Sequence, residues 1–388
     1  SKYQQEFREI GMRLNDRLDH KDWANIYKKL VYWELELEKS RESGMEEILQ
    51  MQKNEADSQF CKYVENNYMD WLSHPEDAPV MSQNLFKHYV IPEVKKNENP
   101  VFFIVIDNLR YDQWKTLSSI ITNDFWIDEE DVFYSILPTT TQYSRNSIFA
   151  GMMPGEIAKR YPDKWSNDED EGGKNLHEQF FLEEQLKRNG LNIKFSYNKV
   201  LNVSYGNKVL NDIPGMFSNP LNVIVYNFVD MLSHARTDTE IIKELANDEA
   251  AYRSVVKSWF EHSTLREILG EIAARGGKLI ITTDHGSIRV KEPVKIVGDK
   301  DVNTNLRYKQ GKTLSFNSKE VFEVRNPEDA HLPKVNMSQA FVFAKNDDFF
   351  AYPNNFNHYV KYYRDTFQHG GISMEEMLIP IIKLTAKK

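Results

Sequence analysis

A short run, Lys278-Leu-Ile-Ile-Thr-Thr-Asp-His-Gly286, constrains the fold of this chain more than any other. Its Ile and Thr residues are β-branched, which favours a buried strand. The strand would end at Asp284-His285, and Gly286 then allows a sharp turn. In open α/β sheets, ligand sites lie beyond the carboxyl ends of the strands. An adjacent carboxylate and imidazole at such a place predict two metal ligands, although an Asp that ends a strand also commonly caps the next element.

Two further apolar runs follow the same pattern. Val101–Ile106 is continuously apolar, as expected for a central strand buried on both faces, and Asp107 follows it. Asn222–Phe228 is a second, strongly apolar strand, with Asp230 just past its end. Segments with helical periodicity separate the runs, and strands that alternate with helices favour a parallel sheet. The sequence therefore predicts an α/β fold with a mostly parallel sheet covered by helices on both faces.

The chain before these strands has a different pattern. Apolar residues recur there at i, i+3 and i+4 spacing, which indicates amphipathic helices that pack as a small bundle. A polar stretch that ends in Pro100 marks the boundary. We expect a helical bundle over residues 1–98 and an α/β domain over residues 99–388. Residues 155–215 are less regular, and we interpret them as an insertion in the α/β domain.

Composition narrows the class of protein. The 388 residues are 40% hydrophobic and 28% charged, which is ordinary for a globular protein. The net charge of −9 argues against general attraction to nucleic acid or to an anionic membrane. A single cysteine, Cys61, excludes an internal disulfide framework and fits a reducing compartment. No apolar run reaches the length of a membrane span, so we expect a cytoplasmic location without membrane attachment.

Residues that suit a metal ion recur near the predicted strand ends. Carboxylate and imidazole ligands suit Zn²⁺, and carboxylates also suit Mn²⁺ or Mg²⁺. Each acid taken singly is as readily a cap or a turn residue, but their joint placement favours a shared site. The candidates are Asp107, Asp230, His234, Asp284, His285 and His369.

A threonine run adds a candidate nucleophile. Thr139-Thr140-Thr141 lies between a predicted strand and a predicted helix. A threonine hydroxyl is weak at neutral pH and needs activation by a base or a metal ion. Backbone N–H groups at the start of the helix would receive an anionic oxygen. The same residues would also simply end the strand and cap the helix, and the local sequence leaves both interpretations open.

Five segments together resemble a known family. VIDNLRYDQW, LPTTTQYSR, NFVDMLSH, TTDHGS and HGGISMEEMLIP follow the order of the metal site in the alkaline phosphatase superfamily. More closely, residues 99–388 resemble a PglZ domain. With the preceding helices, the chain is similar to PorX-type response regulators, whose architecture is receiver, helical bundle and PglZ domain. The abrupt start at Ser1, without an initiator Met, fits a chain that lacks its receiver domain.

The resemblance implies two divalent metal ions, with Zn²⁺ expected and Mn²⁺ as the alternative. It also implies that Thr141 is the nucleophile, because this residue lies three positions beyond Pro138. Thr140 is the alternative nucleophile. One ion would be held by Asp230, His234 and His369, and the other by Asp107, Asp284, His285 and the hydroxyl of Thr141.

The same resemblance implies a function. It predicts a zinc-dependent phosphodiesterase that hydrolyses a nucleotide or oligonucleotide, as the effector of a two-component response regulator linked to type IX secretion. Phosphomonoesterases share this metal site, and the sequence does not separate the two reactions. Sulfatases of the superfamily carry a modified cysteine at the threonine position, so a sulfatase is disfavoured. The alternative is a non-catalytic metal- or ligand-binding module that controls transcription or secretion through protein partners.

The sequence also offers candidates for substrate contacts and for partners. We expect Asn108, Arg307 and Lys309 to contact the substrate phosphate, although an ordinary polar surface explains these residues equally well. Substrate choice would depend on residues 155–215 and on the polar, loop-rich residues 291–335. By resemblance, we expect a sensor kinase and a sigma factor or secretion regulator as partners. We also expect a homodimer.

Overall fold

The structure is a computed structural model that describes residues 2–40, 44–228, 248–299 and 302–387. The chain forms two compact units, which we call the mixed unit and the sheet unit, and each draws on distant parts of the sequence. The division into residues 1–98 and 99–388 is inferred from composition and remains a prediction. The mixed unit comprises Ser1–Pro79, Asn167–Glu169 and Ile288–Leu378, and the sheet unit comprises Val80–Ser166, Asp170–Ser287 and Ile379–Lys388.

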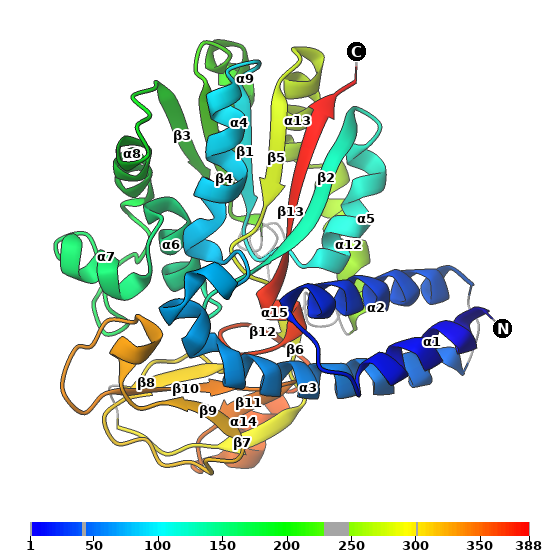
Figure 1. Cartoon of the computed structure of the whole chain (residues 1–388), viewed down its shortest axis with the longest axis vertical. Coiled ribbons are helices and arrows are strands. Elements are labelled where there is room, and N and C mark those ends of the chain that lie inside the picture. Colours follow the sequence, from blue (N-terminus) through cyan, green and yellow to red (C-terminus); the bar gives the residue numbers. More distant parts are fainter. Residues whose placement is uncertain (1, 41–43, 229–247, 300–301, 388) are drawn as a thin grey trace. The chain divides into compact units, whose positions relative to one another are not determined.

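A six-stranded sheet is the centre of the sheet unit (Figure 1). Its order is β2 (Phe125–Tyr134), β13 (Leu378–Ala386), β5 (Lys278–Thr282), β1 (Val101–Ile106), β4 (Leu221–Tyr226) and β3 (Phe195–Val200). β1 is parallel to both β4 and β5, and β3 is parallel to β4. β13 is antiparallel to β5. The predicted, mostly parallel sheet is thus confirmed.

Helices cover both faces of this sheet. Side chains alternate between the two faces of a strand, so adjacent residues of β1 contact elements on opposite faces of the sheet. The ring of Phe102 lies 5.1 Å from that of Phe217, and the ring of Phe103 lies 4.7 Å from that of Phe86. β1 and β4 are therefore buried along their whole length. Within the described residues, the helices of this unit are η2 (Ser82–Asn84), η3 (Phe86–Val90), α4 (Ile91–Lys96), α5 (Tyr111–Ile121), η4 (Thr141–Arg145), α6 (Asn146–Ala150), α7 (Pro154–Arg160), α8 (Glu178–Arg188), α9 (Val203–Met216), α12 (Glu249–Glu261) and α13 (Thr264–Ala274).

The structure corrects the interpretation of residues 155–215 as an insertion. This segment supplies β3, which pairs with β4 along all six of its residues and so belongs to the central sheet. Most of the β3 side chains are only partly buried. An edge strand has one neighbour and needs no continuous apolar run, so its sequence lacks the signal that marks β1 and β4.

The mixed unit begins with the three helices that apolar periodicity predicts. They are α1 (Lys2–Arg13), α2 (His20–Ser40) and α3 (Met45–Ser73). α3 ends just before His74, as expected for a residue that precedes proline. The 3-10 turn η1 (Pro75–Asp77) follows it.

Short strands make up the rest of the mixed unit. β8 (Tyr308–Gly311), β10 (Ala340–Ala344) and β9 (Val321–Val324) form an antiparallel sheet. β11 (Asp348–Ala351) is parallel to β7 (Glu292–Lys295), and β12 (Phe367–Gln368) is antiparallel to β6 (Ile288–Arg289). The sequence reading of residues 291–335 as loop misses β7, β8 and β9, because strands of four residues are too short to show alternation. η5 (Pro327–Ala330), α14 (Phe356–Tyr363) and α15 (Met374–Met377) complete the unit.

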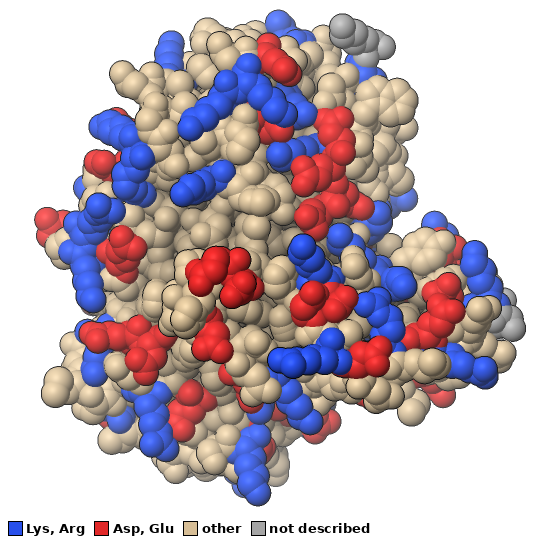
Figure 2. Space-filling view, in the orientation of Figure 1, with Lys and Arg blue, Asp and Glu red and all other residues tan. Residues whose placement is uncertain are grey.

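The character of the helices and the charge of the surface both bear on function. None of the described helices combines the length and the apolar character needed to cross a membrane. The face shown in Figure 2 carries Lys and Arg side chains interspersed with Asp and Glu. Attraction of a phosphate group would therefore depend on local positive charge at the site itself.

Candidate metal centre

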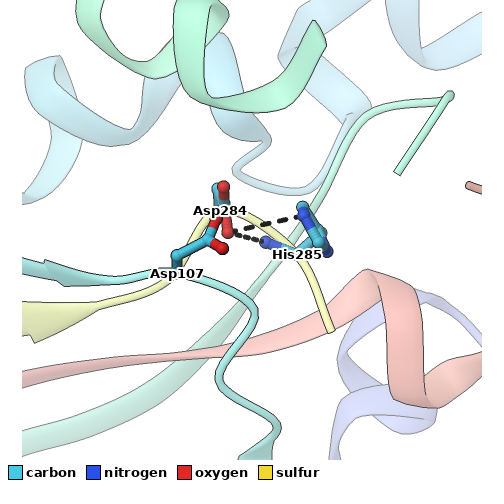
Figure 3. A group of neighbouring side chains, drawn as sticks. All are labelled: Asp107, Asp284 and His285. Carbon is cyan, nitrogen blue, oxygen red and sulfur yellow. Dashed lines mark hydrogen bonds and ion pairs between the residues drawn. The ribbon is translucent and has the colours of Figure 1, made fainter. Parts of the chain in front are cut away.

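Two adjacent parallel strands bring the first candidate ligands together. β1 and β5 pair with Val105 opposite Thr282, so both strands end at the same edge of the sheet. Asp107 directly follows β1, and Asp284 and His285 follow β5 after one residue. One ligand atom from each of these three residues lies within 4.8 Å of the others (Figure 3). The strand ends thus place two carboxylates and one imidazole around a single point.

Backbone hydrogen bonds fix the orientation of Asp284. Asn108 has a left-handed φ of 57°, which turns the chain after Asp107 and lets its N–H donate to Asp284 Oδ1 at 3.1 Å. The N–H of His285 donates to the same oxygen at 2.9 Å. The other oxygen, Oδ2, is buried and has no hydrogen-bond partner among the described residues. A buried carboxylate oxygen without a donor is a suitable ligand for a cation.

The His285 ring is oriented by its own loop. The residue is 1% exposed, and Nδ1 lies 2.9 Å from the carbonyl oxygen of Gly286. Because a carbonyl only accepts, Nδ1 carries the proton in this contact and Nε2 presents its lone pair. Metal-binding histidines commonly have their second nitrogen held in this way. Nε2 is therefore the nitrogen available as a ligand.

The two carboxylates perturb each other strongly. Burial, together with the negative charge of Asp284, raises the pKa of Asp107 well above its usual range. Burial acts in the same direction on Asp284, but His285 and Arg145 outweigh it and hold the pKa of Asp284 below its usual range. Two carboxylates this close do not both ionise readily without a cation. A divalent ion would supply that charge, and two carboxylates with one imidazole suit Zn²⁺.

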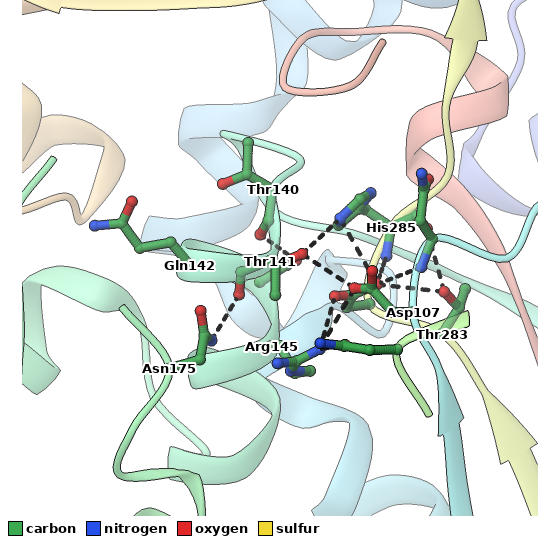
Figure 4. A network of polar contacts seen from close by, with 12 residues as sticks. Asp107, Thr140, Thr141, Gln142, Arg145, Asn175, Thr283 and His285 are labelled. Carbon is green, nitrogen blue, oxygen red and sulfur yellow. Dashed lines mark hydrogen bonds and ion pairs between the residues drawn. The ribbon is translucent and has the colours of Figure 1, made fainter. Parts of the chain in front are cut away.

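The hydroxyl of Thr141 lies at the same point. Thr141 begins the π-helical turn η4, and its Oγ1 lies 3.1 Å from Asp107 Oδ1 and 3.2 Å from His285 Nε2 (Figure 4). The Thr141 carbonyl accepts from Asn175 Nδ2 at 3.0 Å, which holds the backbone of the turn. Thr140 Oγ1, in contrast, is buried without a hydrogen-bond partner in the described part of the chain. Thr141 is thus the threonine that contacts two of the candidate ligands.

The predicted second group of ligands is distributed differently. Asp230 and His234 lie in residues 229–247, outside the described residues. His369 belongs to the mixed unit. The described residues of the sheet unit bring together four of the seven predicted metal ligands, namely Asp107, Thr141, Asp284 and His285.

The loop that follows His369 is held by a buried carboxylate. Glu376 Oε2 accepts from the N–H groups of Gly370 and Gly371, both at 2.8 Å. Gly370 has a φ of 135°, a conformation that only glycine adopts readily. Glu376 also forms an ion pair with Arg307 in which both side chains are 0% exposed. The backbone next to His369 is therefore fixed by an interior ion pair.

The three predicted substrate contacts have different surroundings. Asn108 adjoins Asp284, and its Oδ1 is buried without a hydrogen-bond partner among the described residues. Lys309 donates to the carbonyl of Asn303 at 2.9 Å, and burial lowers the pKa of Lys309 to about 8. Arg307 is committed to Glu376 and to backbone carbonyls inside the mixed unit. A substrate role for these residues remains a prediction.

Two residues at the site were not anticipated from the sequence. Arg145 Nη1 lies 3.4 Å from Asp107 Oδ1, and Arg145 Nε donates to Glu178 Oε1 at 2.6 Å. The segment LPTTTQYSR contains a signal for the first, because Arg145 lies four residues after Thr141 and residues at this spacing share one face of a helix. The sequence around Glu178 carries no comparable signal.

The fold and the site together define an alkaline phosphatase-like hydrolase fold, in which acidic and imidazole side chains gather at the strand ends. The family model described as the BREX system PglZ alkaline phosphatase-like domain matches residues 85–384. The chain therefore belongs to the PglZ family. Residues 1–72 match the model of the PorX response regulator linker domain. Both resemblances inferred from the sequence are confirmed.

The solved structures that this chain matches are distant from it in sequence. Murine ectonucleotide pyrophosphatase/phosphodiesterase 5 is 11% identical over 74% of this chain and 87% of its own, with a TM-score of 0.44. Phosphonoacetate hydrolase from Sinorhizobium meliloti, in complex with phosphonoformate, is 9% identical over 74% of this chain and 89% of its own, with a TM-score of 0.45. No curated protein matches the chain at a significant level.

Proposed function

We propose that this protein is a zinc-dependent phosphodiesterase that hydrolyses a nucleotide or oligonucleotide diester through Thr141. The observation that carries the proposal is the position of the Thr141 hydroxyl, 3.1 Å from Asp107 Oδ1 and 3.2 Å from His285 Nε2. A hydroxyl held between a carboxylate and an imidazole is placed for activation by a base or a metal ion. Membership of an alkaline phosphatase-like family supports phosphoester hydrolysis as the reaction class.

Seven side chains would hold two zinc ions, with Mn²⁺ as the alternative metal. When bound, zinc acts as a Lewis acid towards the phosphate oxygens and lowers the pKa of a coordinated hydroxyl. Asp284 Oδ2, which is buried without a hydrogen-bond partner among the described residues, supports the first of the two sites. The first ion would bind Asp107, Asp284, His285 and Thr141, and the second would bind Asp230, His234 and His369.

The reaction would proceed by two displacements at phosphorus. Thr141 Oγ1 forms a bond to phosphorus, and its proton moves towards Asp107 Oδ1, the acceptor that it already contacts. The bond from phosphorus to one ester oxygen breaks, and this oxygen takes the same proton from Asp107, so that the group leaves as an alcohol. Water then cleaves the phosphothreonine ester, which releases a phosphomonoester and restores the hydroxyl. Asn108, Arg307 and Lys309 are the proposed contacts of the phosphate. Hydrolysis of a phosphomonoester would use the same two displacements.

The match of residues 1–72 to a response regulator linker supports a signalling context. In this proposal, the hydrolase is the cytoplasmic effector of a two-component system linked to type IX secretion. A receiver domain and a sensor kinase would act before it, and a sigma factor or secretion regulator would act after it. The active form would be a homodimer. Comparison of turnover with and without a phosphorylated receiver, together with the mass of the particle in solution, tests this context.

Metal content and ester hydrolysis, measured on the same preparation, test the reaction. We expect near-stoichiometric zinc and cleavage of bis(4-nitrophenyl) phosphate in preference to 4-nitrophenyl phosphate. Thr141→Ala should lose about 10³-fold or more in kcat while it retains at least one metal ion. Thr140→Ala tests the alternative nucleophile and should lose far less.

The other outcomes have definite meanings. Loss of turnover in Thr140→Ala but not in Thr141→Ala would transfer the nucleophile role to Thr140. Preference for the monoester would change the reaction to that of a phosphomonoesterase. Bound zinc without turnover on either ester or on nucleotides would refute the enzyme and support a metal- or ligand-binding regulatory module.

A further inference from the structure

The Arg145 side chain joins four parts of the sheet unit. Its Nε donates to Glu178 Oε1, at the start of α8, at 2.6 Å. Its Nη1 donates to Asp107 Oδ1, after β1, at 3.4 Å and to Asn227 Oδ1, after β4, at 3.3 Å. The same nitrogen lies 3.9 Å from Asp284 Oδ2, after β5. One guanidinium therefore contacts residues that follow three strands and one residue that begins a helix. Figure 4 shows Arg145 beside Asp107 and Thr141.

Arg145 and the proposed nucleophile bind the same oxygen. Thr141 is the first residue and Arg145 the last residue of the turn η4. Both side chains donate to Asp107 Oδ1, at 3.1 Å from Thr141 Oγ1 and at 3.4 Å from Arg145 Nη1. A shift of the guanidinium would thus move the acceptor of the Thr141 hydroxyl as well as the turn that carries it.

Burial and charge show that Arg145 acts on other side chains rather than on a substrate. Arg145 is 2% exposed and Glu178 is 1% exposed. Burial disfavours the charged form, but Glu178, Asp107 and Asp284 outweigh it and raise the pKa of Arg145, so the guanidinium stays charged. Glu178 is itself anchored by the hydroxyl of Tyr197. A planar fork that bonds on two sides suits such a fixed position.

We infer that Arg145 is a positioning residue, which orients Asp107 and Asp284 for the metal ion and holds Thr141 beside them. This inference rests on the proposed function in taking these side chains as the centre of the site. The guanidinium supplies a fixed positive charge next to the carboxylates of Asp107 and Asp284. Glu178 holds the guanidinium through Nε, while Nη1 contacts Asp107.

The test compares Arg145→Lys with Glu178→Gln and with Arg275→Lys as a matched control. Lysine keeps the charge but cannot bond Glu178 and Asp107 at once. Arg275 forms an exposed i, i+4 pair with Glu271 and is 47% exposed at its side chain. Zinc affinity is measured by competition with a chromogenic chelator, and kcat and KM are measured separately on bis(4-nitrophenyl) phosphate. Circular dichroism and thermal melting establish that each variant is folded.

We expect Arg145→Lys to weaken zinc binding by about 10- to 100-fold, the usual effect of removing a partner that orients a metal ligand. The kcat should fall by a similar factor, and KM should change by less than about threefold, because the residue touches no substrate. Glu178→Gln should show the same pattern with a smaller loss. Arg275→Lys should stay within about twofold of the wild type in all three quantities.

A folded Arg145→Lys with wild-type zinc affinity and kcat would overturn the inference. So would a rise in KM at constant kcat, which would indicate contact with substrate. Because zinc affinity is measured without substrate, the positioning role of Arg145 is tested independently of the proposed phosphodiesterase function. Weakened zinc binding in a protein that cleaves no ester would support positioning and refute the proposed function. A wild type that binds no zinc would refute both. If Arg145→Lys does not fold, Glu178→Gln decides by the same criteria.

Discussion

Replacement of Glu376 by glutamine should be among the most damaging single changes in the mixed unit. Glu376 pairs with Arg307, and neither side chain is exposed. Its two carboxylate oxygens also accept from Gly370 N–H at 2.8 Å and from Ser373 Oγ at 2.7 Å. Glutamine would replace one acceptor oxygen by an NH₂ group that faces donors. It would also leave the buried guanidinium without a counter-charge.

The magnitude follows from the burial of the pair. Loss of one partner of a buried ion pair costs about 3–5 kcal/mol, because the remaining charge stays buried without compensation. For a unit of this size, that corresponds to a fall in melting temperature on the order of 10 °C. The matched control is Glu271→Gln, which removes an exposed i, i+4 partner of Arg275. That change should cost less than about 0.5 kcal/mol.

Urea denaturation followed by tryptophan fluorescence and by circular dichroism measures both free energies of unfolding. We also expect the double variant Arg307→Met/Glu376→Gln to lose less than the sum of the two single variants, because the second change removes the uncompensated charge. Zinc content of each purified variant reports on the loop that carries His369. Equal losses for Glu376→Gln and Glu271→Gln, or strict additivity in the double variant, would refute the reasoning.

Three further predictions concern metal, catalysis and pH. Chelation of divalent ions should lower the melting temperature of the wild type, and added zinc should restore it, because a ligand that binds only the folded state stabilises that state. Zinc should not restore the melting temperature of Asp107→Asn or Asp284→Asn. An equal effect of zinc on all three proteins would contradict the proposed metal site. Thr141→Ala should keep the zinc-dependent rise in melting temperature while it loses turnover. Loss of both would show that Thr141 is required for zinc binding and would contradict a role confined to the chemical step. The pKa of Lys309 is about 8, below its ordinary 10.5, so the folded protein binds fewer protons than the unfolded chain between these values. The free energy of unfolding of the wild type, relative to Lys309→Met, should therefore rise by up to roughly 3 kcal/mol from pH 8 to pH 10, and a constant difference over that window would contradict it.

Part of the fold and of the candidate site could be predicted because the relevant signals are local. β1 is a continuous apolar run and β4 is apolar except for Asn222, since a central strand buried on both faces has mainly apolar neighbours. The acids and the histidine that follow such runs could be placed at one sheet edge once parallel pairing was expected. The place of β3 in the central sheet escaped prediction, because its partly buried edge position requires no continuous apolar run. The four-residue strands β7, β8 and β9 of the mixed unit also escaped prediction, because they are too short to show alternation.

The sequence by itself determined where the candidate site residues lie along the chain: Asp107, Thr141, Asp284 and His285 each sit at a strand end or a helix start that local periodicity predicts. Only the tertiary structure decided how these side chains are supported. Arg145 contacts Glu178 across 33 positions of sequence, and Arg307 contacts Glu376 across 69. The physical reason is that a buried charge needs a partner somewhere in the interior, and the folded packing of distant segments, rather than any local pattern, determines which residue meets it.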